Sequence, residues 1–130
     1  MGQSYKDLIA WQKAMELAKL TYRVTEDFPK REIYGMAAQM RRCAVSVPSN
    51  IAEGQGRLSN LDFRKFLSNA LGSLVELETQ STLAADFKFI QPAQLAEIEQ
   101  RAAEIGRLIN WLVASINARE AKAKSAKGRS

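Results

Sequence analysis

Apolar residues recur at alternating steps of three and four positions in four stretches of the chain. This spacing lines up side chains on one face of an α-helix, which has about 3.6 residues per turn. The four series span residues 8–25, 33–51, 63–84 and 95–116. Strand-like alternation of apolar and polar residues does not reach a useful length anywhere. The pattern therefore predicts an all-α protein of four helices.

Residues typical of helix ends lie between the four series. Ser59, with Asp62 three positions later, is typical of a capped helix start, and Pro92 is tolerated in the first turn of a helix. Gly54 and Gly56 are stop signals for the second helix. Short connections between helices of about 20 residues favour an antiparallel up-down four-helix bundle. We predict this bundle for residues 1–118.

Pro48 lies inside the second apolar series, where it removes one backbone hydrogen bond and disfavours helical torsions at Val47. Either the helix is kinked and continues, or it ends near Ser46 and restarts with Asn50 as its cap. The apolar series keeps its phase from Val47 to Ile51. This continuity favours a kinked second helix over an interrupted one.

The first helix carries a second apolar stripe besides the series that starts at Leu8. At about 100° per residue the two stripes lie on nearly opposite faces, so both cannot point into one core. Exposed apolar patches of this kind often mark interfaces. We therefore predict that the second stripe forms a homo-oligomeric contact. Its members are Leu17, Leu20, Val24 and Phe28.

The chain has no histidine and a single cysteine, Cys43. Histidine is the commonest general base and neutral metal ligand, and one cysteine cannot form an internal disulfide or a multi-cysteine metal site. Cys43 falls within an apolar series, which predicts a small buried side chain rather than a nucleophile. The composition thus argues against an enzyme of the usual hydrolytic or metal-dependent kinds.

Carboxylates alone could still hold two metal ions in a helical bundle, and the chain offers Glu53, Glu76 and Glu78. Residues two positions apart point to different sides of a helix, so Glu76 and Glu78 do not converge. Salt bridges to Arg42 or Arg57 are the preferred interpretation. We predict no catalytic residue, no metal site and no cofactor.

The net charge of +5 is concentrated near the C-terminus. Residues 119–130 hold five basic side chains and one acidic one, whereas residues 1–118 are close to neutral. Without an apolar series, residues 119–130 are predicted to be a disordered basic tail. This tail is either a phosphate-binding arm or a solubilising terminus, and the sequence leaves both open.

Phosphate contacts can also come from the predicted helices. Gly54, Gly56 and Arg57 precede the start of the third helix and could bind an anion there, but no strand or Walker lysine accompanies them. A glycine stop followed by a capped helix is the preferred interpretation. The full set of candidate nucleic-acid contacts is Arg41, Arg42, Arg57, Arg64, Lys65, Arg119, Lys122, Lys124, Lys127 and Arg129.

No apolar run approaches the ~18 residues of a membrane span, and no signal-peptide core follows Met1. The sequence therefore predicts a cytoplasmic protein without a membrane partner.

One segment of the second helix resembles a known family. Residues 41–54 read RRCAVSVPSNIAEG and are followed by Gly56 and Arg57, and further matches lie in residues 63–79 and around Trp11. In these motifs the chain resembles the bacterial 23S ribosomal-RNA intervening-sequence proteins, over about residues 5–117. The resemblance implies an antiparallel four-helix bundle with a kinked second helix, assembled as a ring-shaped homopentamer without established catalytic activity.

The chain is also similar to the accessory variability determinant of diversity-generating retroelements, a basic pentamer that binds nucleic acid and its reverse transcriptase. Together with the arginines and the basic tail, this leads to our functional prediction. We expect a non-enzymatic homo-oligomer that binds RNA or DNA electrostatically, without base-specific readout. The alternative is a protein-interaction adaptor, for example for a reverse transcriptase, with little nucleic-acid affinity of its own.

Overall fold

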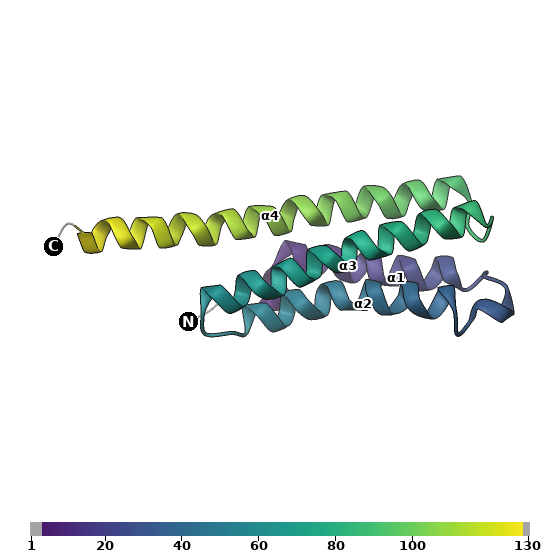
Figure 1. Ribbon diagram of the computed structural model, residues 1–130, viewed down its shortest axis with the longest axis horizontal. Helices are drawn as coiled ribbons and strands as arrows, with labels where there is room; N and C mark the ends of the chain where they lie inside the picture. Colours follow the sequence, from purple (N-terminus) through teal and green to yellow (C-terminus); the bar gives the residue numbers. More distant parts are fainter. Residues whose placement is uncertain (1–3, 129–130) are drawn as a thin grey trace.

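The computed structural model describes residues 4–128, in which all regular structure is helical. Four α-helices follow one another along the chain, as the sequence predicts (Figure 1). Two short 3-10 turns, η1 (Tyr5–Asp7) and η2 (Lys30–Glu32), precede α1 and α2. The helices are α1 (Ile9–Thr25), α2 (Met36–Gln55), α3 (Asn60–Asp86) and α4 (Pro92–Gly128).

The four helices lie alongside one another with similar long-axis directions (Figure 1). Each helix packs against two others: α1 and α3 each contact both α2 and α4. Helices with one apolar stripe bury it in this way around a shared core. The packing is compatible with a four-helix bundle.

The apolar series predicted for the last two helices do form the core. On α3 and α4 the buried residues recur at steps of three, four or seven positions, so each helix turns one face inward. Buried aliphatic side chains, such as Leu77 and Ile105, have no exposed surface at all. The buried set on these two helices is Leu67, Ala70, Leu74, Leu77, Ser81, Ala84, Ile98, Ala102, Ile105, Ile109 and Ile116.

The prediction for α1 is wrong about which stripe faces outward. The stripe assigned to an oligomer contact lies in the core of the chain itself: Leu17 is 0%, Leu20 5%, Val24 3% and Phe28 6% exposed. Small residues on the same face, including Ala14, let α1 approach its neighbours closely. Periodicity identified two apolar faces on this helix, but it could not determine which one the other helices cover.

The second helix is continuous through Pro48, so the alternative in which it ends near Ser46 is wrong. The side-chain amide of Asn50 donates to the Ser46 carbonyl oxygen at 2.8 Å and to the Ser46 hydroxyl at 2.9 Å. Ser46 Oγ also lies 2.8 Å from Ser73 Oγ on α3. Side chains thus supply polar contacts around the proline, where the backbone has one donor fewer.

The predicted helix boundaries are confirmed at three places and wrong at one. The Ser59 hydroxyl accepts a 3.1 Å hydrogen bond from the Asp62 amide at the start of α3, and α4 begins at Pro92. Gly56 caps α2, but Gly54 lies inside the helix and is buried. Its lack of a side chain serves close packing against α3 rather than helix termination.

The predicted disorder of the C-terminal tail is wrong for residues 119–128, which continue α4 as a helix. Residues 129 and 130 lie outside the described part of the chain. Extension of a folded helix requires no new nucleation, and alanine has the highest helix propensity. Four alanines therefore favour continuation here: Ala118, Ala121, Ala123 and Ala126. In addition, Lys127 lies in the last turn, where a cation interacts favourably with the helix dipole.

Between residues 4 and 128, no helix has both the length and the apolar character that crossing a membrane requires.

Candidate functional site

The end of α4 projects beyond the other three helices and is visible as the yellow segment in Figure 1. We call residues 119–128 the basic extension, because they carry four cations and one carboxylate: Arg119, Lys122, Lys124, Lys127 and Glu120. All residues of this segment except Glu120 are exposed. Because successive helix positions differ by about 100°, the cations are distributed around the helix rather than along a single stripe.

A salt bridge joins the base of the basic extension to α3. Arg64 Nη1 lies 2.7 Å from Glu120 Oε1 and also donates to the Asn117 side-chain oxygen at 3.5 Å. This contact neutralises the only carboxylate in the extension. It also occupies Arg64, which sequence analysis had assigned to phosphate binding.

Two more of the predicted phosphate-binding arginines have partners within the chain. Arg57 pairs with Glu53 at 2.9 Å and stacks over the ring of Phe66. Arg41 lies 4.8 Å from the ring centroid of Tyr22, and its Nε donates to Thr25 Oγ1 at 2.8 Å. The Arg41 contacts join α2 to α1, whereas Arg57, which follows the end of α2, contacts Phe66 of α3 and remains exposed.

The other two predicted cations of the helical body, Arg42 and Lys65, are exposed. Lys65 adjoins Phe66, whose ring Arg57 covers at 4.8 Å, so Arg57 and Lys65 are both placed near the connection between α2 and α3, whereas Arg42 lies 15 residues before Arg57. The basic extension differs from the helical body because it carries four exposed cations and only one carboxylate on one projecting segment.

An apolar groove runs between α1 and α2, with a volume of about 550 Å³. The apolar spacing alone does not reveal this groove, because its α1 residues have the spacing of core residues. Trp11 and Met15 are half-buried and Tyr22 is 44% exposed, so large apolar side chains border open space. The groove is lined by Tyr5, Trp11, Met15, Ala18, Lys19, Tyr22, Arg23, Val45, Pro48, Ser49 and Ala52.

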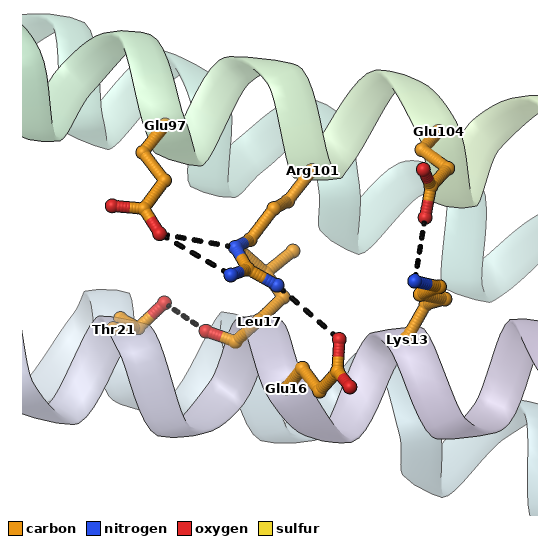
Figure 2. Close-up of polar contacts among 7 residues, drawn as sticks. All are labelled: Lys13, Glu16, Leu17, Thr21, Glu97, Arg101 and Glu104. Carbon is orange, nitrogen blue, oxygen red and sulfur yellow. Dashed lines mark hydrogen bonds and ion pairs between the residues drawn. The ribbon is translucent and has the colours of Figure 1, made fainter.

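A charged seam joins α1 to α4 on another side of the molecule (Figure 2). Lys13 pairs with Glu104 at 3.5 Å, and Arg101 contacts Glu16 of α1 at 3.2 Å and Glu97 of its own helix at 3.3 Å. Each cation thus has a carboxylate partner. Because the charges neutralise one another, this seam is better explained as a contact that orients the two helices than as a ligand site.

The thiol of Cys43 is half-buried between α2 and α3 and donates to a Glu76 carboxylate oxygen at 3.6 Å. Burial raises the pKa of the Cys43 thiol, and the negative charge of Glu76 raises it further. A raised pKa keeps the group in the unreactive thiol form. Over residues 4–128 no group of three or more histidine, cysteine or acidic side chains could hold a metal ion.

Comparison with known proteins identifies a family for the helical body, in residues that precede the basic extension. The family model described as 23S rRNA-intervening sequence protein matches residues 6–111. A crystal structure of a protein with unknown function, from the S23 ribosomal protein family of Bacteroides thetaiotaomicron, has the same fold: the TM-score is 0.77 at 24% sequence identity. The match covers 84% of this chain and 98% of that one. No protein of curated function matches the chain.

Proposed function

This chain belongs to the family of 23S rRNA-intervening sequence proteins, and from that premise we propose that it is a non-enzymatic homo-oligomer that binds nucleic acid electrostatically. The observation that carries the proposal is the basic extension of α4. It presents exposed cations on a helix that projects away from the rest of the molecule (Figure 1). Its only carboxylate is paired with Arg64.

Phosphate binding follows from this charge distribution. Neutralisation of phosphates by Lys and Arg releases condensed counterions, which provides most of the free energy of non-specific binding. Contacts to phosphate oxygens fix position but carry no sequence information. Because the support for binding is the positive charge of the extension alone, base-specific readout is not part of the proposal.

The proposal includes three finer features of the fold. We propose an up-down order of the four helices, in line with α1 starting and α4 ending toward the same end of the molecule (Figure 1). We also propose a kink at Pro48, supported by the side-chain hydrogen bonds of Asn50 to Ser46. The third feature is assembly of five chains into a ring, which rests on resemblance to the family.

The test compares the full chain with two triple variants in binding to a fluorescein-labelled single-stranded RNA of mixed sequence. The first variant replaces Arg119, Lys122 and Lys124 of the basic extension with Gln. The control variant replaces three exposed cations elsewhere: Lys30, Arg31 and Lys88. Fluorescence anisotropy at low salt should show at least a tenfold weaker affinity for the first variant and less than a twofold change for the control.

Equal losses in both variants would show that binding depends on overall charge rather than on the basic extension. No binding of the full chain at low salt would contradict nucleic-acid binding and favour the adaptor function. In that case a protein such as the reverse transcriptase of a diversity-generating retroelement would be the partner to test.

A further inference from the structure

We propose that the α1–α2 groove of one chain receives the outer face of α3 from a second copy of the same chain. This inference rests on the homo-oligomeric part of the proposed function and replaces the contact surface that the sequence predicted wrongly. The outer face of α3 is defined here as its exposed residues from Gly72 to Asp86, with Val75 and Leu83 as its apolar members.

The groove is an apolar surface that nothing within the described chain covers. Tyr22 and Val45 are 44% and 41% exposed, and Trp11 and Met15 remain half-buried beside them. Contiguous apolar surface of this kind typically marks a contact with another molecule. Because the ring of Trp11 already meets Tyr5 edge-on and Arg41 lies over Tyr22, these rings are less available for stacking with nucleic-acid bases. The surface therefore fits a protein better than a nucleic acid.

The charge at the groove specifies the character of its occupant. Lys19 and Arg23 are the charged residues in the lining, and no carboxylate lines it among the described residues. Arg42, also exposed, lies one helical turn before Val45. A helix that fits here should thus combine apolar residues with acidic ones and carry no cation.

The outer face of α3 has this composition. Val75 is 63% and Leu83 43% exposed, and Thr79 lies midway between them at the four-residue spacing of neighbouring turns. Exposed carboxylates Glu76 and Asp86 accompany them. Residues 66–86 contain three acidic side chains and no Lys or Arg. Opposite charges across a contact provide specificity and fix its register.

The exposed face of α4 fits the groove less well. Trp111 is 66% exposed there, but Arg107, four positions before it, is exposed on the same face. A cation opposite Lys19 and Arg23 would repel them. Of the two helices that do not form the groove, α3 is therefore the better match.

The lengths of the two surfaces also agree. From Trp11 to Arg23 the groove follows α1 over 12 residue steps, and at about 1.5 Å per step this is about 18 Å. The outer face of α3 from Gly72 to Asp86 spans 14 residue steps, or about 21 Å on the same scale. An amphipathic helix lying in an apolar groove is a recurrent mode of protein recognition.

Because the groove and the outer face of α3 are different surfaces, the contact between copies is head-to-tail. Each chain would use its groove toward one neighbour and its α3 face toward another. Such heterologous contacts produce closed rings when the rotation between copies closes, and filaments when it does not. This arrangement makes a specific prediction about mixtures of variants, which a two-fold symmetric contact does not share.

The test uses two variants, each with one surface blocked. Val45→Glu places a carboxylate in the groove, and Val75→Lys places a cation on the α3 face. Both positions are exposed, so neither change should alter the helical circular dichroism or the melting temperature. Light scattering on a size-exclusion column should show that the wild-type chain assembles. It should also show that each variant, measured alone, is a single chain. A 1:1 mixture should form a complex of two chains, because the Val45→Glu copy keeps its α3 face and the Val75→Lys copy keeps its groove.

Trp111→Lys on α4 is the matched control and should assemble as the wild type does. If either variant loses helicity, Lys19→Glu with Arg23→Glu replaces Val45→Glu, and Glu76→Lys with Asp86→Lys replaces Val75→Lys. Each charge-reversed variant should be a single chain alone, but their mixture should assemble beyond two chains, because the reversed charges are complementary in the second contact. If both blocked variants still assemble as the wild type does, this contact is overturned and the homo-oligomer stands. Failure of the Val45→Glu and Val75→Lys mixture to form two-chain complexes would likewise overturn the contact. A monomeric wild-type chain would overturn the homo-oligomeric part of the proposed function as well.

Discussion

Gly54 shows how a single residue controls the contact between α2 and α3. A Cβ atom at this position would lie 2.8 Å from Phe66 Cβ and 2.9 Å from Phe63 Cδ1. Carbon atoms of packed side chains do not approach this closely, so one helix would have to shift. The helices meet closely here because position 54 has no side chain.

We predict that Gly54→Ala destabilises the protein by about 1–3 kcal/mol, the usual cost of overpacking. This cost should exceed the gain of about 0.5–1 kcal/mol that alanine normally brings to a helix interior. Gly106→Ala on α4 is the control, because a Cβ there has no neighbour within 4 Å, and it should be stabilising. Urea unfolding measures both, and an equal gain for the two variants would contradict the steric argument.

Glu78 gives a pH-dependent prediction at the same scale. Burial raises the pKa of its carboxyl above the ordinary value, and the nearby charge of Glu99 raises it further. The folded chain therefore favours protonated Glu78. The contribution of protonated Glu78 to the free energy of unfolding is fully present below the ordinary carboxyl pKa. It is lost as the pH rises through the pKa that Glu78 has in the folded state.

At neutral pH, charged Glu78 should thus reduce stability, and Glu78→Gln should increase it. We expect a gain of less than about 0.5 kcal/mol, typical of surface substitutions. Thermal melting of both proteins between pH 3 and pH 8 checks this. The variant should be the more stable protein at pH 7, with the difference vanishing at the acidic end; a difference that grows toward low pH would contradict the sign.

At the scale of elements, sequence and structure agree on the helices and differ on one helix face and one helix end. The apolar series of α3 and α4 predicted most of the buried residues, because each of these helices has a single dominant apolar stripe. Near the start of α3, however, Leu67 is buried and the predicted Phe63 and Phe66 are half-buried. On α1, Trp11, Met15 and Tyr22 have the same spacing as core residues, yet they border the groove. Which of two apolar stripes faces inward depends on the placement of α2 and α4, and local periodicity contains no information about that placement.

The corrected position of the α1 stripe predicts the outcome of substitutions at Leu20. Leu20→Ala should cost about 2–5 kcal/mol, as for other buried leucines, and Leu20→Glu should unfold the chain because it buries an unpaired charge. Tyr22→Ala, on the groove side of the same helix, should cost much less. Guanidinium unfolding monitored by circular dichroism distinguishes the two faces. A folded, dissociated Leu20→Glu protein would instead restore the interface assignment made from the sequence.

At the scale of the whole molecule, charge separates the helical body from its extension. The sequence predicted that positive charge would concentrate after residue 118, and this charge lies on an exposed helix. It could not predict that Arg64 and Glu120, which are 56 positions apart, would pair at the base of the extension. The same limitation applies to Arg41, because its contacts with Tyr22 and Thr25 depend on how α1 and α2 pack. The pairing of Arg57 with Glu53, four positions apart, was instead predicted from the sequence and is confirmed.

The salt dependence of RNA binding tests the central claim most directly. The basic extension with Arg129 offers five cations, so the slope of log K against log salt should be about −3.5 per bound chain on a single strand, at about −0.7 per neutralised phosphate. Replacement of Arg119, Lys122 and Lys124 with Gln should reduce the magnitude of this slope by about 2. Fluorescence anisotropy at several salt concentrations gives both values. An unchanged slope in the variant, or an affinity independent of salt, would contradict the assignment of nucleic-acid binding to the basic extension.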